Sequence, residues 1–256
     1  MRLIALLTLL SVAPWAAEAS TVVVNGDFET WSGGSPTSWT VAGNAVATQV
    51  PGIGGSGSSM LISTTSLSAA DAVIQTLSQS SDDLFTVSVD FTMTQPGAGG
   101  RALNLQLYGG NPTGTTLLLN TRINDAGALQ YFDGVPGSGG LWRTVALSGA
   151  ANGWVGSGSE AVYQLVISGS LDSNSVSYSL YDLTHSLTLA QDVLATDPWQ
   201  LASLDPNATL TQIRFARGNG GTVDYTVDNL FVAVPEPSRA ALALIGLTLL
   251  GGRRRR

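Results

Sequence analysis

The chain has 256 residues, of which 44% are hydrophobic and only 11% are charged, so it can bury a large core beneath a polar, weakly charged surface. Between Ser20 and Pro237, five arginines stand against seventeen acidic residues, a net charge near −12, which argues against nucleic acid as a partner. The absence of cysteine excludes disulfides, zinc–thiolate sites and cysteine nucleophiles.

The first nineteen residues have the parts of a secretory signal peptide. Arg2 supplies an early positive charge, Leu3 to Val12 form an apolar run, and Ala17-Glu18-Ala19 is a small-x-small cleavage pattern. The apolar run is too short to span a membrane. We therefore expect a signal-peptide helix over residues 1–19, cleavage after Ala19, and an exported protein.

The mature chain opens with a distinctive stretch, "NGDFETWSGGSPTSW" at residues 25–39. Asn25-Gly26 predicts a turn, Phe28 is expected to enter the core, and Trp39 is expected to begin the next strand. The stretch resembles the opening of many carbohydrate-binding jelly-roll modules.

That resemblance implies a structural calcium ion held by an acidic residue here and by an aspartate of the last strand. By position these are Glu29 and Asp228, with Asp27 as a further candidate. Calcium takes six to eight oxygen ligands, and backbone carbonyls could supply those that the carboxylates do not. The alternative is that these acids cap turns in an acidic protein.

The body of the chain alternates apolar and polar residues with a period of two, which predicts strands. The clearest stretches are residues 85–94, 103–109, 176–190, 209–218 and 222–234. The alternation changes phase at Asp182, which indicates a hairpin turn or a bulge, and again at Asp228-Asn229, which indicates a bulge.

These strands, separated by glycine-rich turns, predict an all-β fold: one antiparallel β-sandwich, jelly-roll-like, over residues 20–233. No convincing helix, linker or repeat interrupts this region. Residues 71–80 fit a helix or a strand equally well.

The C-terminal segment, residues 234–256, has three parts in order. Val234, Pro235, Glu236, Pro237 and Ser238 are followed by an apolar helix over 240–252 and by Arg253, Arg254, Arg255 and Arg256. The helix would be roughly 20 Å long, short of a hydrocarbon core of about 30 Å, but it is apolar all round and ends in a stop-transfer charge cluster. We therefore expect a transmembrane helix with the arginines in the cytoplasm and the body outside it.

The order of these parts resembles the PEP-CTERM sorting signal of Gram-negative bacteria. The resemblance implies recognition by an exosortase-type membrane protease, which removes the helix. The protein would then be an inner-membrane precursor before it reaches the cell surface or the medium. The family is associated with extracellular polysaccharide.

Catalytic motifs are absent from the sequence: it has no Gly-x-Ser-x-Gly elbow, Walker loop or HExxH. The single histidine, His185, is in phase with Leu183 and Leu187, which predicts a hydrogen-bonded core residue. A glycosidase-like pair of carboxylates stays open, because Asp82, Asp83, Asp90 and Glu160 are available.

Several tryptophans lie near glycine, serine, asparagine or proline, which places them in loops or at strand ends. Trp31, Trp142 and Trp154 would form a sugar-binding surface if they were exposed together. The alternative is that they are core residues of a large sandwich.

The sequence leaves three alternative hypotheses for the function. The first is a non-catalytic surface protein that binds or organises extracellular polysaccharide. The second is a structural matrix component without a specific ligand, and the third is a glycan-active enzyme on a jelly-roll scaffold. Exposed tryptophans on one surface would favour the first, and two carboxylates facing each other across a groove would favour the third.

Overall fold

The computed structural model describes residues 20–64, 71–81, 84–93, 103–109, 116–124, 127–134, 140–148, 161–196, 198–199, 209–216 and 225–234. Residues Thr21–Val234 form one compact unit. The regular elements in the described ranges are β-strands, which confirms the predicted all-β antiparallel sandwich.

The larger sheet has eight strands. Seven follow one another in the order β15–β14–β13–β8–β17–β6–β5 with antiparallel pairing, and β1 pairs with β17. Their bounds are β1 (Ser20–Thr21), β5 (Ala45–Pro51), β6 (Ser58–Thr64), β8 (Leu84–Met93), β13 (Tyr163–Ser170), β14 (Ser175–Asp182), β15 (Leu187–Leu194) and β17 (Tyr225–Val234).

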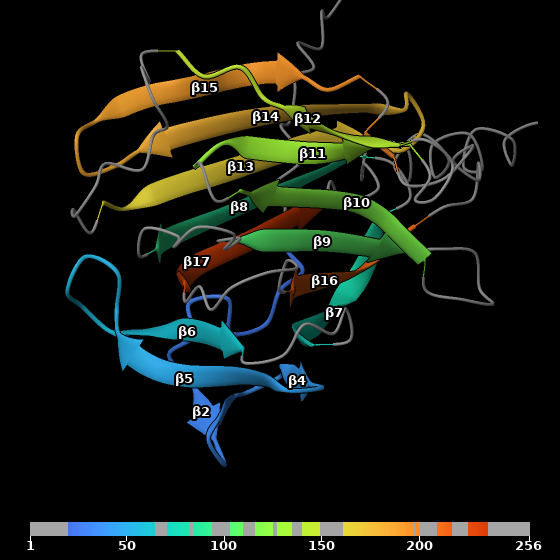
Figure 1. The fold of residues 1–256 in the computed structure, drawn as a ribbon. Coiled ribbons are helices and arrows are strands. Elements are labelled where there is room, and N and C mark those ends of the chain that lie inside the picture. The colour runs from blue at the N-terminus through green and yellow to red at the C-terminus, as the bar shows by residue number, and fades with distance from the viewer. Residues whose placement is uncertain are drawn as a thin grey trace, which may run out of the picture. The chain divides into compact units, whose positions relative to one another are not determined.

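The second sheet has seven antiparallel strands in the order β12–β11–β10–β9–β16–β7–β4. A short hairpin of β2 and β3 stands apart from both sheets. In Figure 1 the strands β9, β10 and β11 lie in front of β8, β13 and β17. The bounds are β2 (Trp31–Ser32), β3 (Ser35–Pro36), β4 (Thr40–Ala42), β7 (Ala72–Ser81), β9 (Asn104–Gly109), β10 (Thr116–Ile123), β11 (Leu129–Asp133), β12 (Leu141–Thr144) and β16 (Leu210–Ala216).

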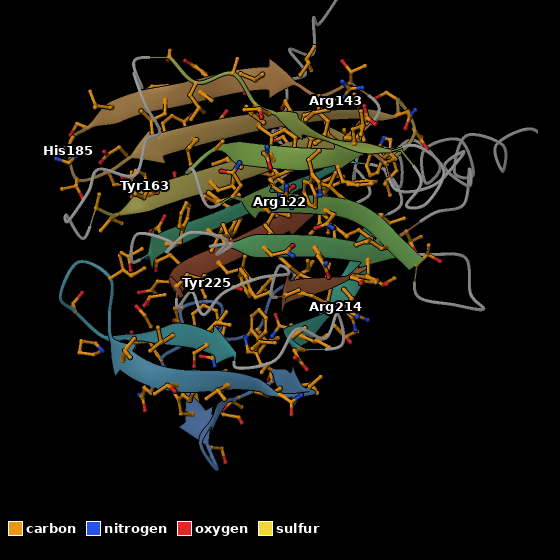
Figure 2. All side chains as sticks on the ribbon, in the orientation of Figure 1. Arg122, Arg143, Tyr163, His185, Arg214 and Tyr225 are labelled. Carbon is orange, nitrogen blue, oxygen red and sulfur yellow. The ribbon has the colours of Figure 1, made fainter. Side chains whose placement is uncertain are left out.

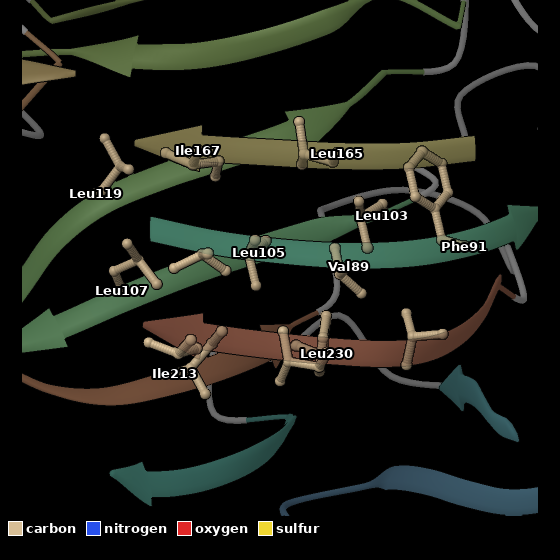
Figure 3. Packing of buried hydrophobic residues seen from close by; sticks show 14 of the residues in the cluster. Val89, Phe91, Leu103, Leu105, Leu107, Leu119, Leu165, Ile167, Ile213 and Leu230 are labelled. Carbon is tan, nitrogen blue, oxygen red and sulfur yellow. The ribbon is translucent and has the colours of Figure 1, made fainter. Parts of the chain in front are cut away.

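The hydrophobic core lies between the two sheets. Alternate residues of β8, including Val89 and Phe91, are fully buried, and so are the leucines of β9. Figure 3 shows these side chains packed together with Leu165 and Ile167 of β13. Burial of each such side chain contributes about 1.5–3 kcal/mol, so this core is the main source of stability.

A polar contact inside the core also joins the sheets. The hydroxyl oxygens of Thr121 on β10 and Tyr178 on β14 lie 3.0 Å apart. Burial raises the pKa of Tyr178, so its phenol stays protonated and can take part in this hydrogen bond. The contact helps to set the two sheets in one arrangement, because a buried hydroxyl without a partner would be costly.

The predicted strands are confirmed where the structure describes them. Residues 176–190 form the hairpin of β14 and β15, and the phase change at Asp182 marks its turn. A break in register between Asp228 and Phe231 of β17 confirms the predicted bulge. Residues 71–80, left open between helix and strand, belong to β7.

The described residues include little of the two ends of the chain. Val234, the first residue of the predicted sorting segment, is the buried last residue of β17. The predicted signal peptide, residues 235–238, the apolar run 240–252 and the four terminal arginines lie outside the described residues. Within the described part of the chain, no helix is long and apolar enough to cross a membrane.

Candidate functional site

The segment that precedes β2 is held by Asn25. This residue has a φ of 54°, a conformation that asparagine tolerates. Its side-chain Nδ2 donates to the carbonyl of Thr30 at 2.8 Å, and its Oδ1 accepts from the Thr30 amide at 3.0 Å. The turn directs Phe28 into the core, where it is fully buried, as the sequence predicted.

Glu29 is two residues after Asp27, and its carboxylate lies against the loop between β5 and β6. Its Oε1 accepts a hydrogen bond from the Ser58 amide at 2.8 Å. A Cβ at Gly57, whose φ is 73°, would clash with this carboxylate. Glycine at position 57 therefore allows Glu29 to lie directly against the loop backbone.

Asp228 reaches the same loop from the bulge of β17. Its Oδ2 accepts from the Ser59 hydroxyl at 2.6 Å and from the Ile53 amide at 3.2 Å, and its Oδ1 accepts from the Asn229 amide at 2.8 Å. The side chain is buried, and this burial raises its pKa, with a further rise from the nearby Asp90.

The structure thus brings Glu29 and Asp228 to consecutive residues at the start of β6, Ser58 and Ser59. Asp27 is exposed and makes no hydrogen bond or ion pair within the described residues. In the same part of the chain, no three acidic, histidine or cysteine side chains gather as a metal cluster. A calcium ion here would therefore have two carboxylates and would need carbonyl oxygens of the loop as well.

A second carboxylate, Asp90 of β8, lies directly opposite Asp228 in the sheet register. Its Oδ1 accepts from the Gln164 side chain at 2.9 Å and its Oδ2 from the Asn229 side chain at 3.0 Å. Like charges placed opposite each other destabilise a sheet, so these amide donors offset part of the repulsion. The sequence marked both acids but could not show that they are neighbours.

The outward-facing surface of the seven-stranded sheet carries polar and aromatic side chains. Because the leucines of β9 point into the core, its alternate residues point outward. Residues paired across antiparallel strands share a face, and Gln106 pairs with both Asn120 and Arg214. We name the following side chains of this surface the outer face: Asn104, Gln106, Tyr108, Asn120, Arg122, Gln130, Phe132, Trp142, Gln212 and Arg214.

Two arginines of the outer face, Arg122 and Arg214, which are labelled in Figure 2, are stacked on aromatic rings. The guanidinium of Arg122 lies 3.6 Å from the centre of the Trp142 ring, and its Nε donates to Gln130 at 2.9 Å. Stacking and hydrogen bonding together fix the guanidinium plane against the tryptophan ring. Phe132 packs edge-on against the same ring, with 5.3 Å between the centroids.

Arg214 repeats this construction on β16. Its guanidinium lies 3.8 Å from the centre of the Tyr108 ring, and its Nε donates to Gln212 at 2.6 Å. The Tyr108 hydroxyl donates to Gln106 at 3.3 Å. Within the described residues, Arg214 forms no ion pair and its terminal amino groups donate no hydrogen bond.

The other predicted aromatic residues are dispersed. Trp31 is in the β2–β3 hairpin, where it packs against the core and its indole donates to the Phe28 carbonyl at 2.6 Å. Trp142 lies on β12, at the edge of the seven-stranded sheet opposite to β4. Trp31 and Trp142 therefore do not lie on one surface. Trp154 lies outside the described residues.

His185 is not the core residue that its phase predicted. It lies in the turn between β14 and β15, and its side chain is 55% exposed. Its Nδ1 lies 2.8 Å from Asp182 Oδ2, and its amide donates to Asp182 Oδ1 at 2.9 Å. The prediction was wrong because the phase change at Asp182 ends the strand, so the alternation does not continue through the turn.

The described residues form an antiparallel β-sandwich whose seven-stranded sheet carries polar and aromatic side chains on its outer face. A conserved carbohydrate esterase from the Shiga toxin-encoding bacteriophage phi24B is similar to this chain, with 13% identity and a TM-score of 0.50 over 85% of this chain and 100% of that one. A cellulose-induced protein is similar at 14% identity and a TM-score of 0.49, over 81% of this chain and 95% of its own.

Lectin II from Ulex europaeus is similar at 11% identity and a TM-score of 0.42, over 74% of this chain and 92% of the lectin. At such identities the likeness concerns the fold alone. No protein-family model matches the chain, and no curated protein is significantly similar to it in sequence.

Proposed function

We propose that this protein is an exported β-sandwich that binds extracellular polysaccharide through the outer face of the seven-stranded sheet. The observation that carries the proposal is the half-buried Trp142, held on Arg122 beside the row of side-chain amides. An indole ring offers an apolar surface for the face of a sugar ring, and amides donate to and accept from its hydroxyls. Because these side chains stand on paired strands, little entropy is lost when they bind.

The proposal is tested by affinity electrophoresis of the full-length protein on a panel of neutral and acidic polysaccharides. Replacing Trp142 by alanine is expected to weaken binding about tenfold or more, since truncating an aromatic hot-spot residue costs about 2 kcal/mol or more. The matched control is Phe231→Ala, which removes an aromatic ring that is 40% exposed on the other sheet. Equal losses in the two variants would contradict the assignment of the face.

The same measurement separates binding from a purely structural role. A structural matrix component without a ligand would bind no polysaccharide of the panel. In that case the contact between the Trp142 and Arg122 side chains would only stabilise the edge strand β12.

Hydrolysis of glycosidic bonds is a second candidate function, favoured by one observation. Asp90 and Asp228 lie opposite each other, and the raised pKa of Asp228 suits a general acid. Both carboxylates are buried and hydrogen-bonded, however, whereas a glycosidase opens its pair to a groove. Release of reducing ends in the binding assay would favour the enzyme, with loss of that release in Asp90→Asn.

We also propose that Glu29 and Asp228 hold a structural calcium ion against the loop between β5 and β6. Their convergence on Ser58 and Ser59 supports this, as does the Oε2 of Glu29, which accepts no hydrogen bond within the described residues. The ion would offset the charge of the buried Asp228 and join the N-terminal segment to the last strand.

Delivery to the surface is proposed from the C-terminal sequence. The Pro-Glu-Pro element, the apolar run and the four arginines would retain a precursor in the inner membrane until an exosortase-type protease removes the helix. Intact-mass measurement of the surface-released protein checks this: the expected mass lacks both the signal peptide and Arg253–Arg256. A released protein that keeps Arg256 would contradict the cleavage.

A further inference from the structure

The charge of the outer face is opposite to that of the protein as a whole. Between Ser20 and Pro237 the net charge is near −12, yet the outer face carries two arginines, and the register puts no described acidic residue on it. Asp90 and Asp228 belong to the other sheet, and Asp133 pairs with Arg143. A basic face on an acidic protein favours an anionic partner, because the rest of the surface repels one.

The side chains of the two arginines are held in the same way. In each, the guanidinium lies on an aromatic ring and the Nε donates to a glutamine, so the plane of the guanidinium is set before any ligand arrives. A planar guanidinium matches a carboxylate through two parallel hydrogen bonds. Arg214 is only partly buried, and within the described residues its terminal amino groups donate no hydrogen bond.

The arrangement suits a chain of sugars rather than a single small anion. Arg122 pairs with Asn104, and Arg214 pairs with Gln106, so the arginines are two strands and two positions apart. With strands about 4.8 Å apart and about 3.4 Å per residue, their Cα atoms are roughly 12 Å apart. Gln106 stands on β9, the strand between them, and pairs with both Asn120 and Arg214, so its side chain can bond hydroxyl groups there.

We propose that the outer face binds a polysaccharide whose sugars carry carboxylate groups, with Arg214 pairing to a carboxylate and Trp142 stacking on a sugar ring. This inference rests on the proposed polysaccharide binding and names the chemical class of the ligand. Arg122 acts as a positioning residue here, because it is 9% exposed and holds the Trp142 ring.

The test compares a polyuronate with the same polymer after its carboxyl groups have been reduced to alcohols. The full-length protein is expected to bind the polyuronate at least tenfold more tightly than the reduced polymer, because a hydrogen bond to a charged carboxylate is roughly twice as strong as one to a neutral hydroxyl group. Rising salt is expected to weaken only the polyuronate complex. This comparison needs no variant, so it does not depend on the folding of a mutant.

Variants then locate the contact. Arg214→Gln is expected to weaken polyuronate binding about tenfold and to weaken binding of the reduced polymer much less, because only the polyuronate offers a charged acceptor to the guanidinium. The control is Arg143→Gln, which removes an exposed arginine that is paired with Asp133 outside the outer face. It is expected to leave both affinities unchanged.

The outcomes separate the inference from the function beneath it. Equal affinity for the polyuronate and its reduced form overturns the inference but leaves polysaccharide binding in place. Tighter binding of RNA, or of a neutral polysaccharide to which sulfate groups have been added, than of the polyuronate also overturns the inference. The face would then respond to charge density alone. No binding to any polymer overturns both proposals.

Discussion

Replacing Trp39 by alanine is expected to lower the free energy of unfolding by about 3–5 kcal/mol, the range for truncating a buried aromatic residue. Trp39 is 7% exposed, and its ring lies between Phe28, 5.3 Å away, and Phe215, 5.8 Å away. Its indole also donates to the Asn25 carbonyl at 3.3 Å. The substitution therefore removes the ring contact with Phe215, which links the N-terminal segment, residues 22–39, to β16.

Urea unfolding followed by circular dichroism measures this loss, and Trp142→Ala provides the matched control. Trp142 is half-buried on the edge strand β12, so its truncation is expected to cost about 1–2 kcal/mol through the lost contacts with Phe132 and Arg122. A Trp39 variant as stable as the Trp142 variant would show that Trp39 does not anchor the N-terminal segment.

Calcium is expected to raise the melting temperature of the full-length protein after treatment with EDTA. At a concentration one hundred times its dissociation constant, a ligand of the native state stabilises it by about 2.7 kcal/mol, which corresponds to a rise of roughly 5–10 °C for a domain of this size. Glu29→Gln and Asp228→Asn are expected to abolish most of the rise, because each removes a charged ligand from the loop.

Asp27→Asn is the control for the calcium experiment. Asp27 is exposed and contacts neither of the other two acids within the described residues, so this variant is expected to keep the full response. The calcium proposal fails if the unmodified protein shows no rise. It also fails if Asp27→Asn loses the response while Glu29→Gln keeps it.

The local pattern of the chain was sufficient for its fold class. The alternation in residues 85–94 and 103–109 predicted β8 and β9, and the phase change near Asp228 predicted the bulge in β17. These predictions succeed because a strand buried on one face must alternate, and because a bulge must interrupt that alternation. Local pattern was not sufficient for β7, whose sequence suits helix and strand equally, since the neighbouring strands β16 and β4 decide its state.

Gly26 illustrates the limit of local interpretation. Its place after Asn25 suggested a turn residue, but Asn25 is the residue with positive φ. Gly26 is needed because a Cβ would clash with the carbonyl oxygen of Leu230, whose amide donates to the Gly26 carbonyl at 2.8 Å. The partner is two hundred positions away, so no local pattern could have indicated it.

The candidate sites follow the same division. The sequence alone predicted the strands, and the resemblance to jelly-roll modules grouped Glu29 with Asp228, whose carboxylates the structure brings to Ser58 and Ser59. The export and sorting segments stay predictions, because they lie outside the described residues. The arrangement of the outer face required the fold, because Arg122, Trp142, Tyr108 and Arg214 come from four strands whose neighbours are set by sheet order. Antiparallel register brings together side chains that are far apart in the chain, and that register depends on the packing of the whole core.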